Sequence, residues 1–178
     1  MSGGTWRWVQ CVPAWATLAL LAGLTVALRL PFLTPRLAHW DAVNYALGLH
    51  EFNVAAHQPH PPGSPLYILL GRAALSVVGD DNAALILVSV VASVGAVLLE
   101  YVLARLLFGQ RAGLVAAALL LSQPIFWGYG TLATPWTLLS CLALAIGVCA
   151  LLLRRGRRWL VFPSAALVGL GSGFRLDA

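Results

Sequence analysis

Long apolar stretches alternate with short polar interruptions along the chain, and the length of the apolar stretches predicts the structure. A membrane-spanning helix needs about 20 mostly apolar residues, because each residue adds about 1.5 Å and the hydrocarbon layer is about 30 Å thick. Five stretches approach this length, at about residues 12–33, 82–106, 112–128, 135–153 and 159–174. The predicted fold class is therefore an all-α integral membrane protein with about five transmembrane helices.

The stretch between Arg111 and Arg154 contains 42 consecutive positions without a charged residue. Such a length suffices for two spans and a turn. Gly128, Gly130 and Pro135 lie near its middle and favour a break in the helix there. This pattern predicts a hairpin of two spans, which returns the chain to the side of the membrane that it left.

The arginines that flank the apolar stretches predict the orientation. Arg105, Arg111 and the run at 154–158 fall on one side of the predicted hairpin. Positive residues are enriched in cytoplasmic loops, so we assign this side, and the N-terminus with Arg7, to the cytoplasm. The prediction is a multi-pass protein of the cell membrane with a cytoplasmic N-terminus and one large external loop, residues 34–80.

The apolar segment 65–79 is too short to cross the membrane, since 15 helical residues reach only about 22 Å. It also carries Arg72 near its centre. We interpret this segment as a helix that lies on, or dips into, the external interface. The alternative is a sixth crossing, which would place Arg105 and the run at 154–158 outside the cell.

The composition agrees with a lipid environment. The 178 residues are 60% hydrophobic and 10% charged, whereas soluble domains carry about 25% charged residues. The net charge of +5 comes from arginine alone. Basic chains can bind nucleic acid, but these arginines flank apolar stretches, so we expect membrane lipid as a partner and no nucleic acid.

Most of the polar chemistry lies in residues 39–67, within the predicted external loop. This segment contains all four histidines, four of the ten prolines, and the acidic residues Asp41 and Glu51. Its first part has helical periodicity, because Trp40, Val43 and Leu47 share one apolar face. The opposite, more polar face carries Asp41, Asn44, Tyr45 and Gly48. An aspartate at a helix start can be only a cap, but few other carboxylates could serve chemistry on the outer face.

The prolines that follow predict a stiff turn that holds His57 and His60 in place, since proline fixes φ and biases the preceding residue to an extended conformation. The alternative is a simple connection between two interfacial helices. Zinc requires three or four converging ligands, and the segment has no HExxH pattern and no cysteine. We expect no metal and no other cofactor, although a metal-binding loop remains an alternative.

Taken together, these motifs resemble the start of a GT-C type membrane glycosyltransferase, in the branch of the protein O-mannosyltransferases and lipid A aminoarabinose transferases. The resemblance covers nearly the whole chain. Its motifs, in order, are HWDAVNYALGLHEF, PHPPGSPLYILLGR, YVLARLLFGQR, LSQPIFW and GLGSGFR.

The resemblance implies transfer of a sugar from a polyprenyl-phosphate carrier to an acceptor on the outer face. The acceptor, a protein, lipid or glycan, is not identified by it. In this family a carboxylate of the first external loop acts as general base, which corresponds to Asp41. His60 and Arg175 would help to bind the donor phosphate or sugar. The predicted substrate-binding set, completed from the residues themselves, is Tyr45, His57, His60, Arg72 and Arg175.

The chain also departs from the family pattern. Relatives often have an acidic pair where Asp41 is followed by Ala42, and several have a further acidic residue in the next external loop, which here reads GYGTLATP. Family members are usually longer, so we expect residues 1–178 to form the N-terminal transmembrane module of a longer protein. The alternative function is a non-catalytic membrane protein, such as part of a transporter or an assembly subunit.

Overall fold

The structure, a computed structural model, describes residues 13–172. Within this range the chain folds into helices, and its only extended pairing is an isolated bridge between Asn53 and Gln58. Arg7, predicted to lie on the cytoplasmic side, and Arg175, predicted to bind substrate, lie outside the described residues.

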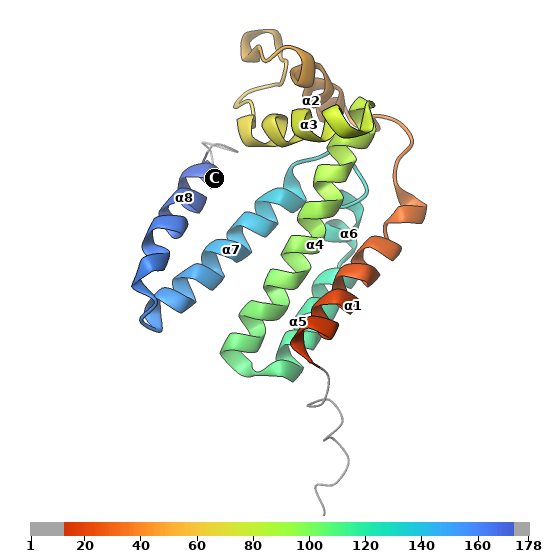
Figure 1. Ribbon diagram of the computed structural model, residues 1–178. Helices are drawn as coiled ribbons and strands as arrows, with labels where there is room; N and C mark the ends of the chain where they lie inside the picture. Colours follow the sequence, from red (N-terminus) through yellow and green to blue (C-terminus); the bar gives the residue numbers. More distant parts are fainter. Residues whose placement is uncertain (1–12, 173–178) are drawn as a thin grey trace, which may run out of the picture.

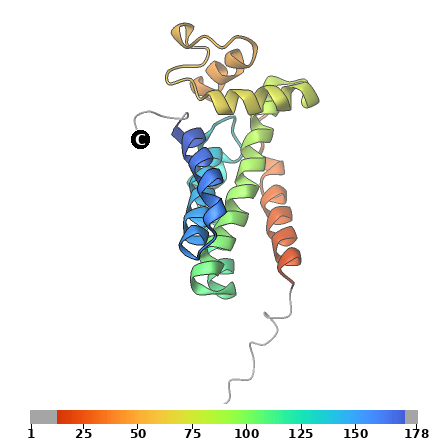
Figure 2. The same cartoon turned by 60° about the vertical axis from the view of Figure 1, so that its left-hand side comes forward.

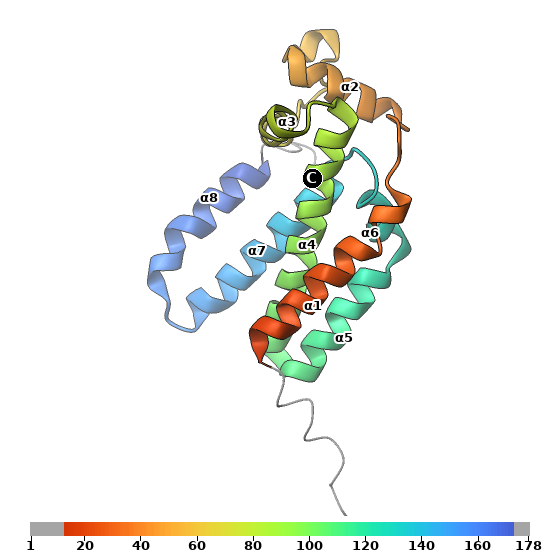
Figure 3. The same ribbon diagram turned by 45° about the vertical axis from the view of Figure 1, so that its right-hand side comes forward.

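Five helices run alternately in opposite directions and form an elongated bundle (Figure 1). They are α1 (Ala14–Ala27), α4 (Asp81–Phe108), α5 (Gln110–Ser122), α7 (Trp136–Arg154) and α8 (Val161–Ser172). The central helix is α4, which packs against α1, α5 and α7. As a result, the C-terminal end of α1 and the N-terminal ends of α4 and α7 meet at one end of the bundle, which we call the upper end (Figure 3).

Three segments are long and apolar enough to cross a membrane: Ala14–Phe32, Asp81–Phe108 and Trp136–Arg154. The first consists of α1 and the 3₁₀ turn Leu30–Phe32. Helices α5 and α8 run between the same two ends of the bundle but are shorter (Figure 1). Three candidate spans are therefore present among residues 13–172, and the predicted count of five stays a prediction.

The predicted span over residues 112–128 is not one continuous helix in the structure, because the chain breaks inside it. Helix α5 ends at Ser122, and a separate short helix, α6 (Pro124–Tyr129), follows. Pro124 has no backbone N–H and disfavours a helical conformation of Gln123. The Gln123 side chain then caps the new helix by accepting a hydrogen bond from the backbone N–H of Phe126.

Two further helices, α2 (Trp40–His50) and α3 (Pro65–Val78), lie across the upper end of the bundle (Figure 2). Helix α3 ends at Gly79, whose φ of 74° is a left-handed conformation that glycine adopts readily. Asp80 then caps α4 and starts the new helix direction. The course of α3, across rather than along the long helices, is the one expected of an interfacial helix.

Buried side chains join this upper layer to the bundle. Tyr45 and Leu49 of α2, Tyr67 and Ile68 of α3, and Leu85 of α4 belong to one hydrophobic cluster. Gly71 of α3 also approaches α2 and α4 so closely that an added Cβ would lie 2.7 Å from a methyl carbon of Leu49. The upper layer is thus packed on the bundle, and it positions the segment that carries the candidate site.

A buried arginine, which the sequence analysis did not single out, lies just after α1. Arg29 has no exposed surface, and its Nη1 donates to the backbone oxygen of Thr25 at 3.1 Å. Its guanidinium lies 5.3 Å from the ring centre of Phe126 in α6. The nitrogens Nε and Nη2 have no hydrogen-bond partner among the described residues. Arg29 therefore fills the contact between α1 and the segment after α6, where Gly130 leaves room for it.

Candidate active site

Asp41 lies in the first turn of α2, one of the two helices across the upper end of the bundle (Figure 2). His39 is the residue that caps this helix, and its Nδ1 accepts a hydrogen bond from the backbone N–H of Asp41 at 3.3 Å. The cap function that an aspartate could have had is therefore supplied by a histidine. The Asp41 side chain is 37% exposed, so its carboxylate is accessible to a substrate.

Two histidines flank this carboxylate. Nδ1 of His39 lies 3.7 Å from Oδ2 of Asp41, and Nδ1 of His60 lies 3.9 Å from Oδ1. Both distances exceed the usual hydrogen-bond length of about 3 Å, so neither imidazole is hydrogen-bonded to the carboxylate. The Nδ1 atom of His60 is buried and has no hydrogen-bond partner among the described residues. The site thus combines a carboxylate that can accept a proton with an imidazole nitrogen whose hydrogen-bonding capacity is unused among the described residues.

Aromatic rings fix the position of His60. Its ring centre lies 5.2 Å from that of Tyr45, and Tyr45 in turn meets Tyr67 edge-on at 5.1 Å. Tyr67 is fully buried, and its hydroxyl donates to the backbone oxygen of Leu85 at 3.3 Å. Burial raises the pKa of the Tyr67 phenol well above its usual value, so the hydroxyl stays protonated. These contacts connect His60 through two rings to α4.

The proline turn is pressed against α2. Pro59 is fully buried, and a Cβ added to Gly48 would lie 2.9 Å from Cδ of Pro59. The peptide bonds Gln58–Pro59 and Pro61–Pro62 are both cis. Because the turn packs on the residue two helical turns after Asp41, it brings His60 back along α2 toward the carboxylate.

The two faces of α2 have the residues that the sequence pattern predicts, but the more polar face points inward. Asn44, Tyr45 and Gly48 are buried, whereas the apolar residues Trp40 and Leu47 are exposed. Trp40 is the most exposed of these, at 74%. An exposed tryptophan of this kind suits a membrane interface. The polar face points into the upper layer, where the site lies.

Two other predicted substrate-binding residues, His57 and Arg72, are not gathered at Asp41. His57 is exposed, has a left-handed backbone conformation, and shows no contact with Asp41 in the described part of the chain. Arg72 binds the opposite end of α2: its Nε donates to the backbone oxygen of Leu49 at 2.8 Å, and its Nη2 donates to that of Gly48 at 3.0 Å. That end lies about 10 Å along the helix from Asp41.

These bonds give Arg72 a structural role, since they satisfy carbonyl groups at the C-terminal end of α2. Replacing Arg72 with glutamine should lower the free energy of unfolding by about 1 to 3 kcal/mol. Thermal unfolding of the purified protein in detergent would measure this loss. A higher KM for a lipid-linked donor without loss of stability would instead support the phosphate contact that the sequence predicts.

A histidine–aspartate pair holds the same end of α2 to the bundle. Nε2 of His50 lies 3.0 and 2.9 Å from the two carboxylate oxygens of Asp81, in the first turn of α4. This pair is a link between helices rather than part of a metal site. Among residues 13–172, no group of three or more histidine, cysteine, aspartate or glutamate side chains could hold a metal ion.

Sequence reasoning missed two members of the site. His39 was noted only as one of four histidines, although its place directly before the first helical residue, Trp40, is a signal for a capping role. Tyr67 was hidden in the predicted interfacial helix, where an aromatic residue is expected on composition alone. Its contact with Tyr45 depends on how α2 and α3 pack.

Comparison with known families decides the class of the protein. The family model described as dolichyl-phosphate-mannose-protein mannosyltransferase matches residues 59–177, which is about two thirds of the chain. The chain belongs to this family. The sequence-based identification as a GT-C type glycosyltransferase is thus confirmed, and with its apolar helices this family member is a multi-pass membrane protein.

The matched region starts within the proline turn and contains α3 to α8, so His60, Tyr67 and Arg72 are part of the mannosyltransferase-family match. Helix α2 with Asp41 precedes the matched residues. Asp41 is included in the candidate site because the fold brings it close to His60. No curated protein and no solved structure matches the chain.

Proposed function

We propose that the protein transfers a sugar from a polyprenyl-phosphate donor to a hydroxyl group of an acceptor, on the outer face of the membrane. The observation that carries this proposal is the partly exposed carboxylate of Asp41 between His39 and His60. It lies on α2, in the layer across the upper end of the long helices. In the proposal this layer lies next to the membrane–water boundary, where a lipid carrier presents its phosphate.

In the proposed reaction, Asp41 accepts the proton of the acceptor hydroxyl. The hydroxyl oxygen of the acceptor at the same time bonds to the anomeric carbon of the sugar. The bond from this carbon to the phosphate oxygen breaks, and the carrier leaves as polyprenyl phosphate. The sugar-phosphate bond is already activated, so one general base suffices, unlike the carboxylate pair of glycoside hydrolases. A single displacement inverts the anomeric configuration.

The imidazole of His60 is placed to assist this step. Its unpartnered Nδ1 lies near the carboxylate, so a hydrogen bond from it to a sugar or phosphate oxygen would hold the donor beside Asp41. Tyr45, whose ring contacts that of His60, would form one wall of this position. The same proposal includes contacts of the donor phosphate with His57, Arg72 and Arg175. Positively charged side chains at the phosphate would stabilise the negative charge of the leaving group. No resident cofactor is required for this chemistry.

The donor class can be tested directly with the full-length protein in proteoliposomes. We expect sugar transfer from polyprenyl-phosphate mannose and none from the nucleotide sugar GDP-mannose, because the proposed site acts next to the membrane–water boundary. Nuclear magnetic resonance of the product should show an inverted anomeric centre. Transfer from the nucleotide sugar at a similar rate, or retention of configuration, would contradict the proposal.

The proposed orientation gives a second test. In a variant without cysteines, Trp40→Cys should react with a membrane-impermeant maleimide added to the outside of intact cells, because this position is exposed beside Asp41. Arg157→Cys, in the turn at the other end of the bundle, is the matched control and should react only after the membrane is opened. Labelling of the two positions in the reverse order would place Asp41 on the cytoplasmic side.

A further inference from the structure

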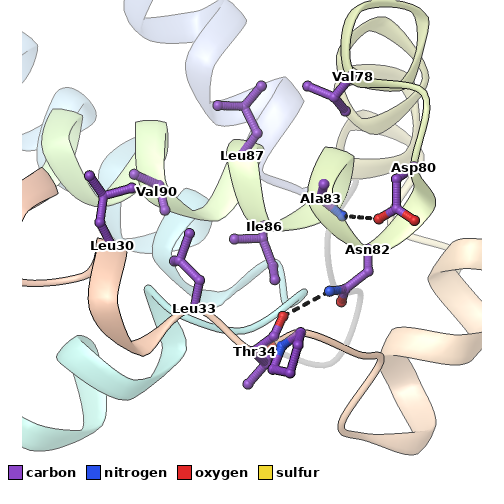
Figure 4. A pocket seen from close by; sticks show the side chains of 11 residues that line it. Leu30, Leu33, Thr34, Val78, Asp80, Asn82, Ala83, Ile86, Leu87 and Val90 are labelled. Carbon is purple, nitrogen blue, oxygen red and sulfur yellow. Dashed lines mark hydrogen bonds between the residues drawn. The ribbon is translucent and has the colours of Figure 1, made fainter.

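A cavity of about 430 Å³ lies at the upper end of the bundle, on the side of α4 that faces the connection from α1 to α2 (Figure 4). Its walls come from the 3₁₀ turn after α1, the end of α3 and the first turns of α4. None of the candidate site residues lines it. Asn82, at its polar end, follows Asp81, which pairs with the C-terminal end of α2. The cavity thus lies beside the corner that holds the C-terminal end of α2, whereas Asp41 lies in the first turn of that helix.

Most of the cavity wall is hydrocarbon. Its apolar side chains include Leu30, Leu33, Ile86, Leu87 and Val90 (Figure 4). Leu30 and Leu87 are also exposed on the molecular surface. Because Leu30 and Leu87 belong to segments that are candidate membrane spans, the cavity opens toward the region that lipid would occupy. An alkyl chain is the occupant that such a wall fits.

The polar end of the cavity is formed by Asn82, and its amide orientation is determined by a neighbour. Nδ2 of Asn82 donates to the backbone oxygen of Thr34 at 2.8 Å (Figure 4). A flipped amide would bring two oxygens together, so Oδ1 must point the other way. Oδ1 is buried and has no hydrogen-bond partner among the described residues. An unsatisfied buried acceptor costs about 1 to 3 kcal/mol, so it favours an occupant that donates a hydrogen bond.

The other polar groups of the cavity provide acceptors as well. The hydroxyl of Thr34 donates outside the cavity, to the backbone oxygen of Thr131 at 3.2 Å. One carboxylate oxygen of Asp80 accepts from the N–H of Ala83 at 2.8 Å, which leaves the second oxygen and the negative charge for a ligand. The positive end of the α4 dipole amounts to about half a charge, less than the full charge of the Asp80 carboxylate. The polar end thus selects a donor and disfavours an anion.

From this arrangement we infer that the cavity binds a membrane lipid with a primary ammonium headgroup, such as phosphatidylethanolamine. One acyl chain lies along the apolar wall, and the ammonium group donates to Oδ1 of Asn82 and to the carboxylate of Asp80. The ammonium group both matches the negative charge and has N–H groups, which a choline headgroup lacks. This lipid contacts residues 30–35, the start of the connection that leads to Asp41.

Binding can be measured without any transferase assay. The purified full-length protein in detergent is titrated with phosphatidylethanolamine that carries a pyrene-labelled acyl chain, and energy transfer from tryptophan reports binding. Unlabelled phosphatidylethanolamine should displace the probe at about three- to five-fold lower concentration than phosphatidylcholine. This is the ratio expected of one net hydrogen bond, since the choline headgroup carries the same charge but no N–H group. Equal competition by the two lipids, or stronger competition by anionic phosphatidylglycerol, would overturn the inference.

Two variants locate the site. Asp80→Asn keeps a residue that caps helices well but replaces a charged hydrogen-bond acceptor with a neutral one. It should therefore weaken binding of phosphatidylethanolamine and reduce its preference over phosphatidylcholine. Ala83→Phe should fill the cavity from the exposed start of α4 and abolish saturable binding. Ala73→Phe, at an exposed position of α3 outside the cavity, is the matched control and should bind like the wild type. Unchanged binding in Ala83→Phe would show that the lipid binds elsewhere.

Discussion

Replacement of Asp41 with asparagine should lower the rate of sugar transfer by about 10²- to 10⁴-fold, the usual contribution of a general base. Asparagine has nearly the same shape but cannot accept the proton of the acceptor hydroxyl. The cap of α2 is formed by His39 and not by Asp41, so the helix should remain intact. The KM for the polyprenyl-phosphate donor should change little, because the lost step concerns the acceptor.

Initial rates with a radiolabelled lipid-linked donor, measured on proteoliposomes that contain equal amounts of folded protein, would give the effect. Glu51→Gln is the matched control, because Glu51 is an exposed carboxylate just after the same helix, and its side chain accepts a hydrogen bond from Asn53. This variant should transfer sugar at the wild-type rate. If Asp41→Asn retained more than a third of the wild-type rate, Asp41 would have no role as a base.

Replacement of Gly130 with alanine should lower the free energy of unfolding by about 2 kcal/mol or more. An added Cβ there would collide with Nε of Arg29 and lie 2.6 Å from Oγ of Ser93. Both side chains are fully buried, and Oγ of Ser93 is already bonded to the backbone oxygen of Ser89 at 2.8 Å. Neither neighbour can give way without breaking a buried contact.

Gly128→Ala is the matched control for this prediction, two residues earlier in the same short segment. An added Cβ at Gly128 meets no atom within 4 Å, and alanine should favour the helical conformation of α6 slightly. Denaturant-induced unfolding in detergent, followed by tryptophan fluorescence, would compare the two variants. Equal stability of the two variants would mean that Arg29 is not confined as the structure has it.

Sequence periodicity was sufficient for the elements of the fold because apolar length and helix-breaking residues are local properties. The expected helix around residues 82–106 corresponds to α4, and that around 135–153 corresponds to α7. The break at Gln123 was missed, although Pro124 is a local signal for it. The glycines farther along drew attention to residues 128–135, where a loop does follow α6.

The site was predictable in part. Asp41 and His60 were chosen from scarcity and from family resemblance, and the structure places Nδ1 of His60 3.9 Å from Oδ1 of Asp41. Their proximity depends on Pro59 packing against Gly48, which is a tertiary contact between residues 11 positions apart in the sequence. No periodicity encodes such a contact. The bonds of Arg72 to α2 were hidden for the same reason.

Arg29 shows a different limit. An arginine at the edge of an apolar stretch usually extends its charged end to the interface, and that pattern is indistinguishable in sequence from a buried arginine. The guanidinium instead turns inward because Gly130 leaves space and Phe126 offers the face of its ring. Only the packing of α6 against the end of α1 separates the two cases.

The attachment of α2 has a mechanical consequence. Arg72 of α3 and Asp81 of α4 both hold its C-terminal end, while Asp41 lies at the opposite end. The position of α2 therefore depends on the corner between α3 and α4. A change in the tilt of α3 would move the carboxylate with it. If α3 rests on the bilayer, the thickness and tension of that bilayer become determinants of where the proposed catalytic base stands.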